Sequence, residues 1–340
     1  MKNINSVLLK TKVRNSILFS SLLLLNLFSI NSVIISKADA SVTNKAIRPL
    51  DIRSQSPLHG LRYTAAPKQA YALEKDKTEF TTSTDISSIW ANSSDFILDF
   101  NMIDFKVGFD HGLGDGWTSH VSLTERRVIN AHLDQATISF HKLMGLGQDG
   151  RTEVPKHQTV ISVPKYNIHI EGFQNTTFSR PLVIGLAKEV YSDNKSAYSV
   201  SIYGQTETKN SAWKDAGGLD LSLQTDAQWR WSKLSAFNSF AISRLDQEDF
   251  YSVPLRKELW MASFGLGWQN SRQGEVVVQY LINKGAAKDV GELTKRNHEL
   301  SMGYRWNFAS WSAELAVTEN LFHFYNSPDI AFHGNLKLYI

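Results

Sequence analysis

The feature that most constrains this chain is a regular alternation of apolar and polar residues, which recurs in short segments from about residue 78 to the end. Residues that alternate with a period of two point to opposite faces of a β-strand, so each segment predicts a strand with one apolar face. The clearest apolar series comprises Leu219, Leu221, Leu223, Ala227, Trp229 and Trp231. Further series run over 103–109, 260–268, 276–282 and 300–308. The pattern therefore predicts an all-β, antiparallel protein.

Two all-β architectures fit such alternation. A soluble sandwich exposes its polar faces to water, whereas a transmembrane barrel turns its apolar faces to lipid and encloses the polar ones. The segments run for about 10–14 residues, which is enough for a tilted strand to cross a bilayer. Tryptophans gather at the ends of the apolar series, as in an interfacial aromatic girdle. The girdle candidates are Trp229, Trp231, Trp260, Trp268, Trp306 and Trp311. These features favour the barrel.

The expected number of strands is about 12, because bacterial barrels have an even number and both ends on the periplasmic side. A further candidate, 157–171, is left out because Pro164 interrupts its pairing. The expected strands are 78–90, 96–110, 117–129, 180–191, 197–208, 218–231, 234–245, 258–269, 275–283, 297–308, 310–319 and 330–340. Short connections then fall on the periplasmic side, and longer ones such as 246–257 and 284–296 fall outside.

One expected outer connection, 130–179, is too long to be an ordinary loop. Leu133, Ala136, Phe140 and Leu143 recur in it at helical spacing, so it contains a short amphipathic helix with an apolar face. An apolar face needs a surface to cover. The helix therefore folds into the barrel mouth as a constriction, caps the barrel, or lies on its rim.

Residues 1–40 read as an export signal. Basic residues precede an apolar run over 16–36, and Ala38-Asp39-Ala40 supplies small residues for cleavage after Ala40. The alternative is a transmembrane anchor, since the run is long enough to span a bilayer. The formal net charge of +3 comes from this segment, so the remaining chain gives no reason to expect nucleic-acid binding.

The segment 41–77 lies between the signal and the expected barrel domain, 78–340. It is polar, contains three prolines and lacks a clear period. We interpret it as a periplasmic or lumen-lying arm, with a disordered tail as the alternative. At the other end of the chain, 330–340 alternates up to Ile340 and resembles the C-terminal strand that outer-membrane barrels present to their assembly machinery.

No motif of an enzyme or a cofactor site is evident. The chain has no cysteine, which excludes a disulfide framework and a thiolate metal site. Its ten histidines do not have the spacing of a helical metal pair. The glycine-rich 112–116 falls in an expected turn, where it supplies positive φ angles. We therefore expect no metal, no cofactor and no catalytic residue. A lipid hydrolase that assembles a serine and a histidine from distant strands stays a third possibility.

Three stretches resemble an uncharacterised proteobacterial family of outer-membrane barrels, the domain of unknown function 3187. They are Ser56–Leu61, Asp134–Arg151 and Thr318–Ile340, of which the middle one is the most specific. The resemblance covers about 55–340. It implies export, the barrel and the unusual outer loop, and it implies no activity.

The sequence therefore predicts a barrel of the outer membrane, in contact with outer-membrane lipid. The leading function is a porin-like or solute-selective channel. Its selectivity would depend on charged residues that alternate toward the lumen, namely Asp104, Lys106, Arg230, Glu299 and Arg305. The alternative is a non-conducting barrel with a structural or surface-interaction role, whose lumen is filled by the arm and by 130–179.

Overall fold

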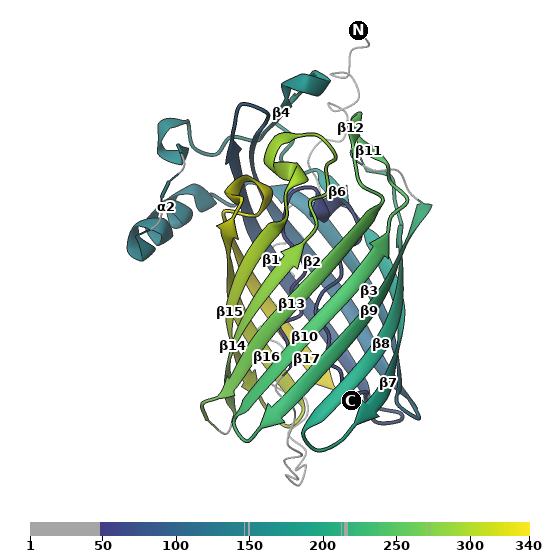
Figure 1. The fold of residues 1–340 in the computed structure, drawn as a ribbon. Helices are drawn as coiled ribbons and strands as arrows, with labels where there is room; N and C mark the ends of the chain where they lie inside the picture. Colours follow the sequence, from purple (N-terminus) through teal and green to yellow (C-terminus); the bar gives the residue numbers. More distant parts are fainter. Residues whose placement is uncertain (1–47, 146, 149, 212, 214–216, 272) are drawn as a thin grey trace, which may run out of the picture. The chain divides into compact units, whose positions relative to one another are not determined.

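A computed structural model describes residues 48–340, except 146, 149, 212, 214–216 and 272. Its main feature is a closed antiparallel barrel of twelve strands, in which each strand pairs with its neighbours in sequence and β17 pairs with β1 (Figure 1). The barrel strands are β1 (Thr78–Asn92), β2 (Ile97–Gly114), β3 (Trp117–Ile129), β7 (Pro181–Ser192), β8 (Ser196–Glu207), β9 (Gly217–Trp231), β10 (Leu234–Arg244), β13 (Glu258–Gln269), β14 (Gly274–Asn283), β15 (Asn297–Asn307), β16 (Trp311–Phe322) and β17 (Ile330–Tyr339). The predicted fold class is confirmed.

The side chains of the barrel wall are apolar on the outside and polar on the inside. On β9, Leu223 is 56% exposed, whereas its neighbour Gln224 is 1% exposed. Large apolar residues such as Ile184, Phe264 and Met302 likewise remain exposed on the outer wall. A soluble sandwich would bury these residues, so the wall is built to face lipid.

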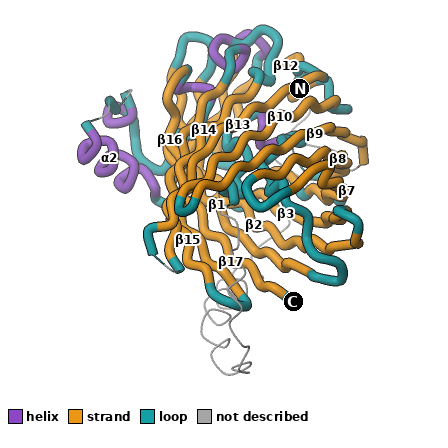
Figure 2. The backbone as a smooth tube through the Cα atoms, turned by 60° about the horizontal axis from the view of Figure 1, so that its bottom comes forward, coloured by secondary structure: helices purple, strands orange, loops and turns teal. Residues whose placement is uncertain are grey.

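The two ends of the barrel differ in the length of their connections. Two to four residues join the strands at one end, which we call the turn end, and both β1 and β17 begin or finish there (Figures 1 and 2). At the other end, which we call the loop end, four residues join β1 to β2 and much longer segments join the other strands. This asymmetry is typical of barrels whose turn end lies in the periplasm.

The long segments at the loop end carry small elements of their own. They comprise β4 (Val160–Val163), β5 (Ile168–Glu171), β6 (Thr177–Ser179), β11 (Asp249–Phe250), β12 (Val253–Pro254) and the 3₁₀ turns η4 (Arg151–Glu153), η5 (Pro164–Tyr166), η6 (Gly291–Thr294) and η7 (Phe324–Asn326). Pro164 opens η5, which separates β4 from β5, so this part of the chain adds a short hairpin to the edge of β2 and no spanning strand. Apolar residues including Phe100, Phe178, Trp213 and Phe250 form a core across the loop end.

Helix α2 (Leu133–Met144) lies beside the outer wall of the barrel, near the loop end (Figure 1). Its buried residues are Asp134, Thr137, Ile138 and His141. His141 Nε2 lies 3.1 Å from Glu319 Oε1 on the outer face of β16. The helix therefore docks on the barrel with a largely polar face.

The predicted apolar face is not the buried face of this helix. Ala136 and Leu143 are exposed, Leu143 by 81%, whereas Leu133 and Phe140 are half-buried. The reason is a polar cluster on the docking side that period analysis does not reveal: Arg151 pairs with Asp134 and Asp329. These ion pairs fix the polar face of the helix against the wall and leave Ala136 and Leu143 exposed.

The predicted signal, 1–40, lies outside the described residues. Among the helices that the structure describes, none is both long and apolar enough to cross a membrane.

Candidate functional site: a lumen filled by the N-terminal arm

Residues 48–77, which we call the arm, run inside the barrel and form a hairpin. The arm begins with Arg48 at the turn end. There Arg48 contacts Glu79 near the start of β1, Ser312 near the start of β16 and Tyr339 at the end of β17. The 3₁₀ turn η3 (His59–Leu61) lies at the loop end, where His59 Nε2 is 3.0 Å from the carbonyl oxygen of Lys284. The chain then returns, and the Asp76 amide donates to Gly112 back at the turn end.

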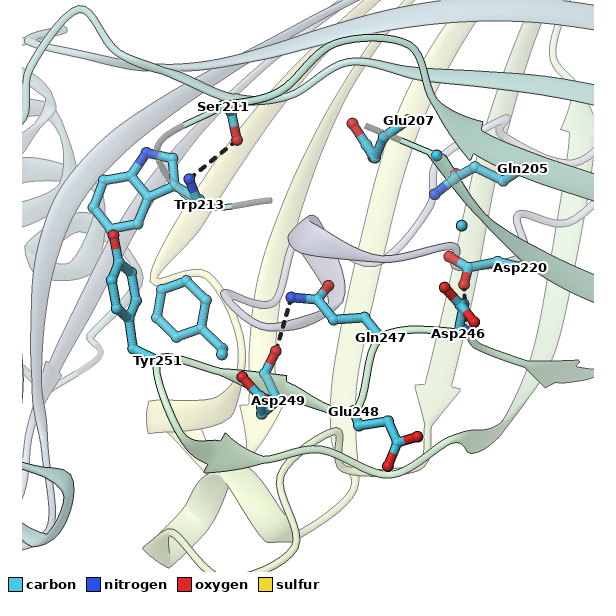
Figure 3. A pocket seen from close by; sticks show the side chains of 13 residues that line it. Gln205, Glu207, Ser211, Trp213, Asp220, Asp246, Gln247, Glu248, Asp249 and Tyr251 are labelled. Carbon is cyan, nitrogen blue, oxygen red and sulfur yellow. Dashed lines mark hydrogen bonds between the residues drawn. The ribbon is translucent and has the colours of Figure 1, made fainter. Parts of the chain in front are cut away.

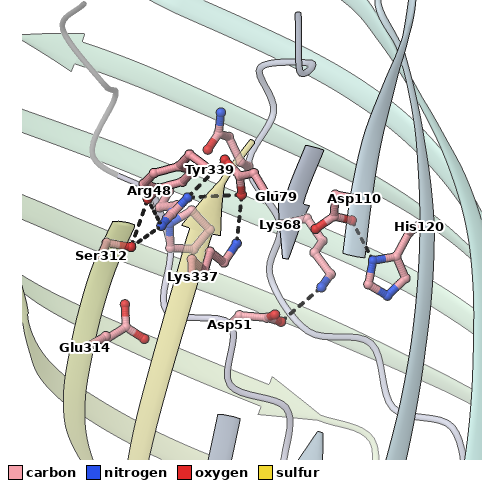
Figure 4. Close-up of polar contacts among 12 residues, drawn as sticks. Arg48, Asp51, Lys68, Glu79, Asp110, His120, Ser312, Glu314, Lys337 and Tyr339 are labelled. Carbon is pink, nitrogen blue, oxygen red and sulfur yellow. Dashed lines mark hydrogen bonds and ion pairs between the residues drawn. The ribbon is translucent and has the colours of Figure 1, made fainter. Parts of the chain in front are cut away.

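We call the part of the arm before η3 the ascending limb and the part after it the descending limb. Charged contacts hold the ascending limb at the turn end (Figure 4). Arg48 Nη1 lies 3.2 Å from Glu79 Oε2 on β1, and Arg48 Nη2 lies 2.6 Å from the hydroxyl of Tyr339 on β17. The carboxylate of Asp51 pairs with two lysines. Its Oδ2 lies 2.8 Å from Lys106 Nζ on β2, and its Oδ1 lies 3.0 Å from Lys68 Nζ on the descending limb. Asp51 therefore ties both limbs of the hairpin to the barrel wall.

Farther into the lumen, the arm meets two buried carboxylates of the wall. Arg53 Nη2 donates to Asp104 Oδ2 over 2.7 Å. The Ser54 hydroxyl donates to Glu299 Oε1 over 2.8 Å and accepts Asn297 Nδ2 at 2.6 Å. Each of these wall residues lies on an inward-facing position, so the inner wall provides the partners for the polar groups of the arm.

The descending limb binds to the wall mainly through its backbone. The amides of Tyr63, Lys68 and Ala72 donate to Asp220, Asp226 and Glu189 in turn. Two of the acceptors lie on β9, and Glu189 lies on β7. Backbone contacts of this kind hold an extended chain whatever its side chains are.

All five predicted lumen charges point inward, and each has a partner. Asp104 and Lys106 bind Arg53 and Asp51 of the arm, and Glu299 binds Ser54. Arg230 lies over the ring of the arm residue Tyr71. Arg305 pairs with Glu275 and Glu314, and it donates to the carbonyls of Arg48 and Pro49. The five lie along the lumen and do not meet at one site.

The sequence pattern identifies the charges of the wall but not those of the arm. Arg48, Asp51, Arg53 and Lys68 lie in a segment without strand or helix period, so no face could be assigned to them. The available signal was charge complementarity, because this polar segment carries both signs next to a wall that also carries both.

A cavity of about 390 Å³ lies inside the barrel at the loop end (Figure 3), and we call it the vestibule. Carboxylates of Glu207, Asp220, Asp246 and Asp249 line it, together with an aromatic wall that includes Trp213. The amides of Tyr63 and Asp246 both donate to Asp220, so the arm contacts one of the carboxylates that line the vestibule. The vestibule is therefore an anionic chamber next to the arm.

A second, smaller cavity of about 80 Å³ lies beside the arm toward the turn end, and its lining includes Tyr203, Asp226 and Lys337. Buried Tyr63 of the arm and Tyr203 of β8 belong to one apolar cluster. The arm therefore also has apolar contacts with the inner wall.

Most of the predicted girdle tryptophans gather at the turn end. Trp231 pairs with Leu234, which also pairs with Trp268, and Trp306 and Trp311 flank the next turn. Trp229 precedes Trp231 on the same outer face. Trp260 is at the loop end of β13.

One group of inward side chains has the order of a hydrolase triad. His333 Nδ1 lies 2.9 Å from Asp85 Oδ1, and His333 Nε2 lies 2.7 Å from Thr318 Oγ1. Thr318 has no exposed surface and also contacts the hydroxyl of Ser301. Neither cavity described above includes these side chains. A nucleophile needs room for its substrate, so this arrangement is better explained as a hydrogen-bond network between β1, β16 and β17.

Comparison with solved structures places the fold among outer-membrane barrels. The structure of the COG4313 outer membrane channel from Pseudomonas putida F1 aligns with a TM-score of 0.52 and 14% sequence identity, over 81% of this chain and 100% of that chain. The translocator domain of the autotransporter NalP from Neisseria meningitidis aligns with a TM-score of 0.41 and 10% identity, over 78% of this chain and 88% of that chain. No curated protein sequence matches the chain.

The sequence also matches a family model, described as protein of unknown function (DUF3187), over residues 25–339. The match includes the arm, the barrel strands and helix α2. The chain is therefore a member of this family of outer-membrane barrel proteins.

Proposed function

We propose that this protein is an outer-membrane solute channel whose lumen is closed at rest by its own arm. The observation that carries the proposal is the chemistry of the contact between arm and wall. Arg48, Asp51, Arg53 and Ser54 bind the wall through ion pairs and hydrogen bonds. Such contacts exchange readily with water, and buried ion pairs add little net stability compared with an apolar core. A polar plug is therefore suited to release.

The inner wall itself supports the same proposal. The inward hydroxyls of Ser83, Ser87, Ser235 and Ser263 have no protein partner among the described residues. Buried hydroxyl groups without a partner are costly unless water reaches them. A wall of this composition suits a lumen that is hydrated around the arm and conducts when the arm moves.

The alternative is a sealed barrel with a structural or surface-interaction role. One observation favours it: Leu58 and Leu61 at the tip of the arm belong to the buried apolar core of the loop end. Burying two leucines stabilises the closed arrangement by about 3–6 kcal/mol. Conduction would require that this contact be broken or that the tip stay in place while the limbs separate.

A disulfide lock tests the proposal, because the chain has no cysteine of its own. Ser54→Cys and Asn297→Cys would link the arm to β15, since the two native side chains touch. In planar bilayers the reduced double variant should open at least as often as the wild type, because it lacks the native hydrogen bond between these two side chains. Its oxidised form should stay closed until reductant is added.

The matched control carries Ser54→Cys alone, which cannot form the link. The proposal fails if the wild type never conducts across the voltages and solutes tried, or if oxidation leaves conductance unchanged after cross-linking is verified by mass spectrometry. Conductance of a variant that lacks 48–73 gives a second measurement. This deletion should open the lumen of a plugged channel and of a sealed structural barrel alike. Only the channel should also conduct as the intact protein.

A further inference from the structure

A basic pocket lies on the outer wall of the barrel at the loop end, separate from the lumen. Its volume is about 470 Å³. The ionisable side chains that line it are Arg256, Lys284, Lys295, Arg296, His298 and His323. Every ionisable residue of this lining is a base, and no carboxylate belongs to it. Such a concentration of positive charge costs free energy unless an anion is available to balance it.

The position of the pocket follows from the register of the strands. Trp260 on β13 pairs with Ile242, and His298 on β15 pairs with Ile282. Directly opposed residues of an antiparallel pair share a face, and Ile242 is an exposed residue of the lipid-facing wall. The pocket therefore opens on the outside of the barrel.

Two of the positive charges of the pocket are free to meet a ligand. Within the described part of the chain, Lys284 and Arg296 form no ion pair. The Cζ atom of Arg296 lies 5.5 Å from the centroid of the Trp260 ring, and the side chain is exposed. The carboxylate of Glu292 lies close to two other bases of the lining, with its Oε1 3.9 Å from Lys295 Nζ and 4.0 Å from His323 Nδ1.

Arg256 has a different role from the other bases. Its Nη1 donates to the backbone carbonyls of Gly285, Ala287 and Thr294. These bonds join the two loop-end segments on either side of β14. Arg256 thus builds the frame of the pocket, and Lys284, Lys295 and Arg296 supply the other long basic side chains of its lining.

Below the pocket, the outer faces of β13 and β15 are apolar, and on the neighbouring β16 the outward Glu319 is bound by His141 of α2. Phe264 follows Trp260 down β13, Met302 follows His298 down β15, and Phe322 ends β16 beside His298. Each of these three side chains is exposed by more than half. A molecule with an anionic head and long apolar chains would place its head in the pocket and its chains along this wall.

We propose that this pocket binds the phosphate groups of an anionic lipid of the outer leaflet. The proposal rests on the membrane orientation used for the proposed function, in which the loop end faces outward. The apolar wall beneath the pocket favours a lipid over free phosphate, because free phosphate would gain nothing from Phe264, Met302 and Phe322.

The test uses the full chain in detergent micelles, with binding measured by native mass spectrometry and by tryptophan fluorescence. The probes are diphosphorylated lipid A, the same lipid with both phosphates removed, and inorganic phosphate. We expect binding of the phosphorylated lipid alone. Lys284→Gln together with Arg296→Gln should weaken it by about 10- to 30-fold, because each basic group near a charged headgroup contributes about a factor of five.

The matched control removes the same charge at the turn end, through Lys195→Gln and Lys233→Gln, both of which are exposed. It should bind the lipid as the wild type does. Arg256 is kept, because its loss would disturb the loops. Equal binding of dephosphorylated lipid, equal binding by both double variants, or binding of inorganic phosphate with the same affinity would each overturn the proposal. Conductance plays no part in this test, so its result is independent of whether the barrel is a channel.

Discussion

Asp104 of β2 holds Arg53 of the arm and Arg126 of β3 at the same time. Arg53 Nη2 lies 2.7 Å from Asp104 Oδ2, and Arg126 Nε lies 2.5 Å from Asp104 Oδ1. Arg126 is fully buried, whereas Arg53 keeps some exposed surface. One carboxylate thus serves both the wall of the barrel and the plug inside it, and the two functions can be separated by changing one arginine at a time.

Arg53→Gln should loosen the arm without weakening the barrel, because the pair of Asp104 and Arg126 remains. We expect a higher frequency of openings in planar bilayers and an unchanged urea midpoint. Arg126→Gln leaves Asp104 with a single partner and should destabilise the barrel by about 3–5 kcal/mol. The prediction would be contradicted if Arg53→Gln lowered the urea midpoint and Arg126→Gln left it unchanged.

Gly185→Ala should destabilise the barrel because of Tyr203. A Cβ atom at Gly185 would lie 2.2 Å from Tyr203 Cδ1, so the ring would have to move. Overpacking of this kind costs about 1–3 kcal/mol and should lower the midpoint of urea unfolding. Gly204→Ala is the control, since its Cβ would meet nothing closer than 3.6 Å. Equal midpoints for the two variants would show that Tyr203 moves aside freely.

A charge on the outer wall should cost more in the middle of the membrane than at its edge. Leu223 and Leu234 are both exposed, at 56% and 50%, but Leu223 lies midway along β9 and Leu234 begins β10 at the turn end. Leu223→Arg should destabilise the reconstituted barrel by about 2–4 kcal/mol, and Leu234→Arg by about 0–1 kcal/mol. Similar costs for both would argue against the assumed depth of these residues.

Docking of α2 should depend on pH through His141. Its hydrogen bond to Glu319 raises the pKa of His141 above the ordinary value. A raised folded-state pKa contributes stability that is fully present below the unfolded value of about 6.5 and is lost as the pH rises through the folded value. Hydrogen exchange of α2 should therefore quicken with pH beyond the intrinsic rate increase. His141→Gln should abolish this extra dependence, and a variant that keeps it would refute the assignment.

The carboxylates of the vestibule should make the open channel prefer cations. Asp246→Asn with Asp249→Asn removes two of them and keeps Asp220, which binds the arm. The reversal potential of this variant, measured in a salt gradient, should lie closer to zero than that of the wild type, because the preference for cations is weaker. Glu74→Gln with Asp115→Asn removes the same charge at the turn end, where both residues are exposed, and should have a smaller effect.

The strands could be predicted from the sequence because their period is a local property. The expected strand 258–269 coincides with β13, and the expected strand 117–129 with β3. Every strand has lipid on its outer side and polar groups on its inner side, so every strand needs the same alternation. The outward and inward residues of a segment can therefore be assigned from that segment alone. The same reasoning correctly left 157–171 out of the spanning set, because Pro164 breaks the pairing there.

The contacts between elements could not be predicted in this way. The apolar stripe of α2 is visible in the sequence, but Arg151 and Asp329, which turn its polar face to the wall, lie outside the helix. The arm presents the same difficulty, since its extended backbone takes its shape from partners such as Asp220 and Asp226. Only a three-dimensional arrangement brings these partners together.

The hairpin path of the arm has a consequence for how the lumen could be emptied. The chain enters at Arg48 and leaves at Lys77 on the same side of the barrel. Because both ends of the hairpin lie at the turn end, the arm can leave the lumen as a folded hairpin through that end. No chain end has to pass through the barrel. The seam between β1 and β17 can stay closed throughout, so the barrel need not unfold to open.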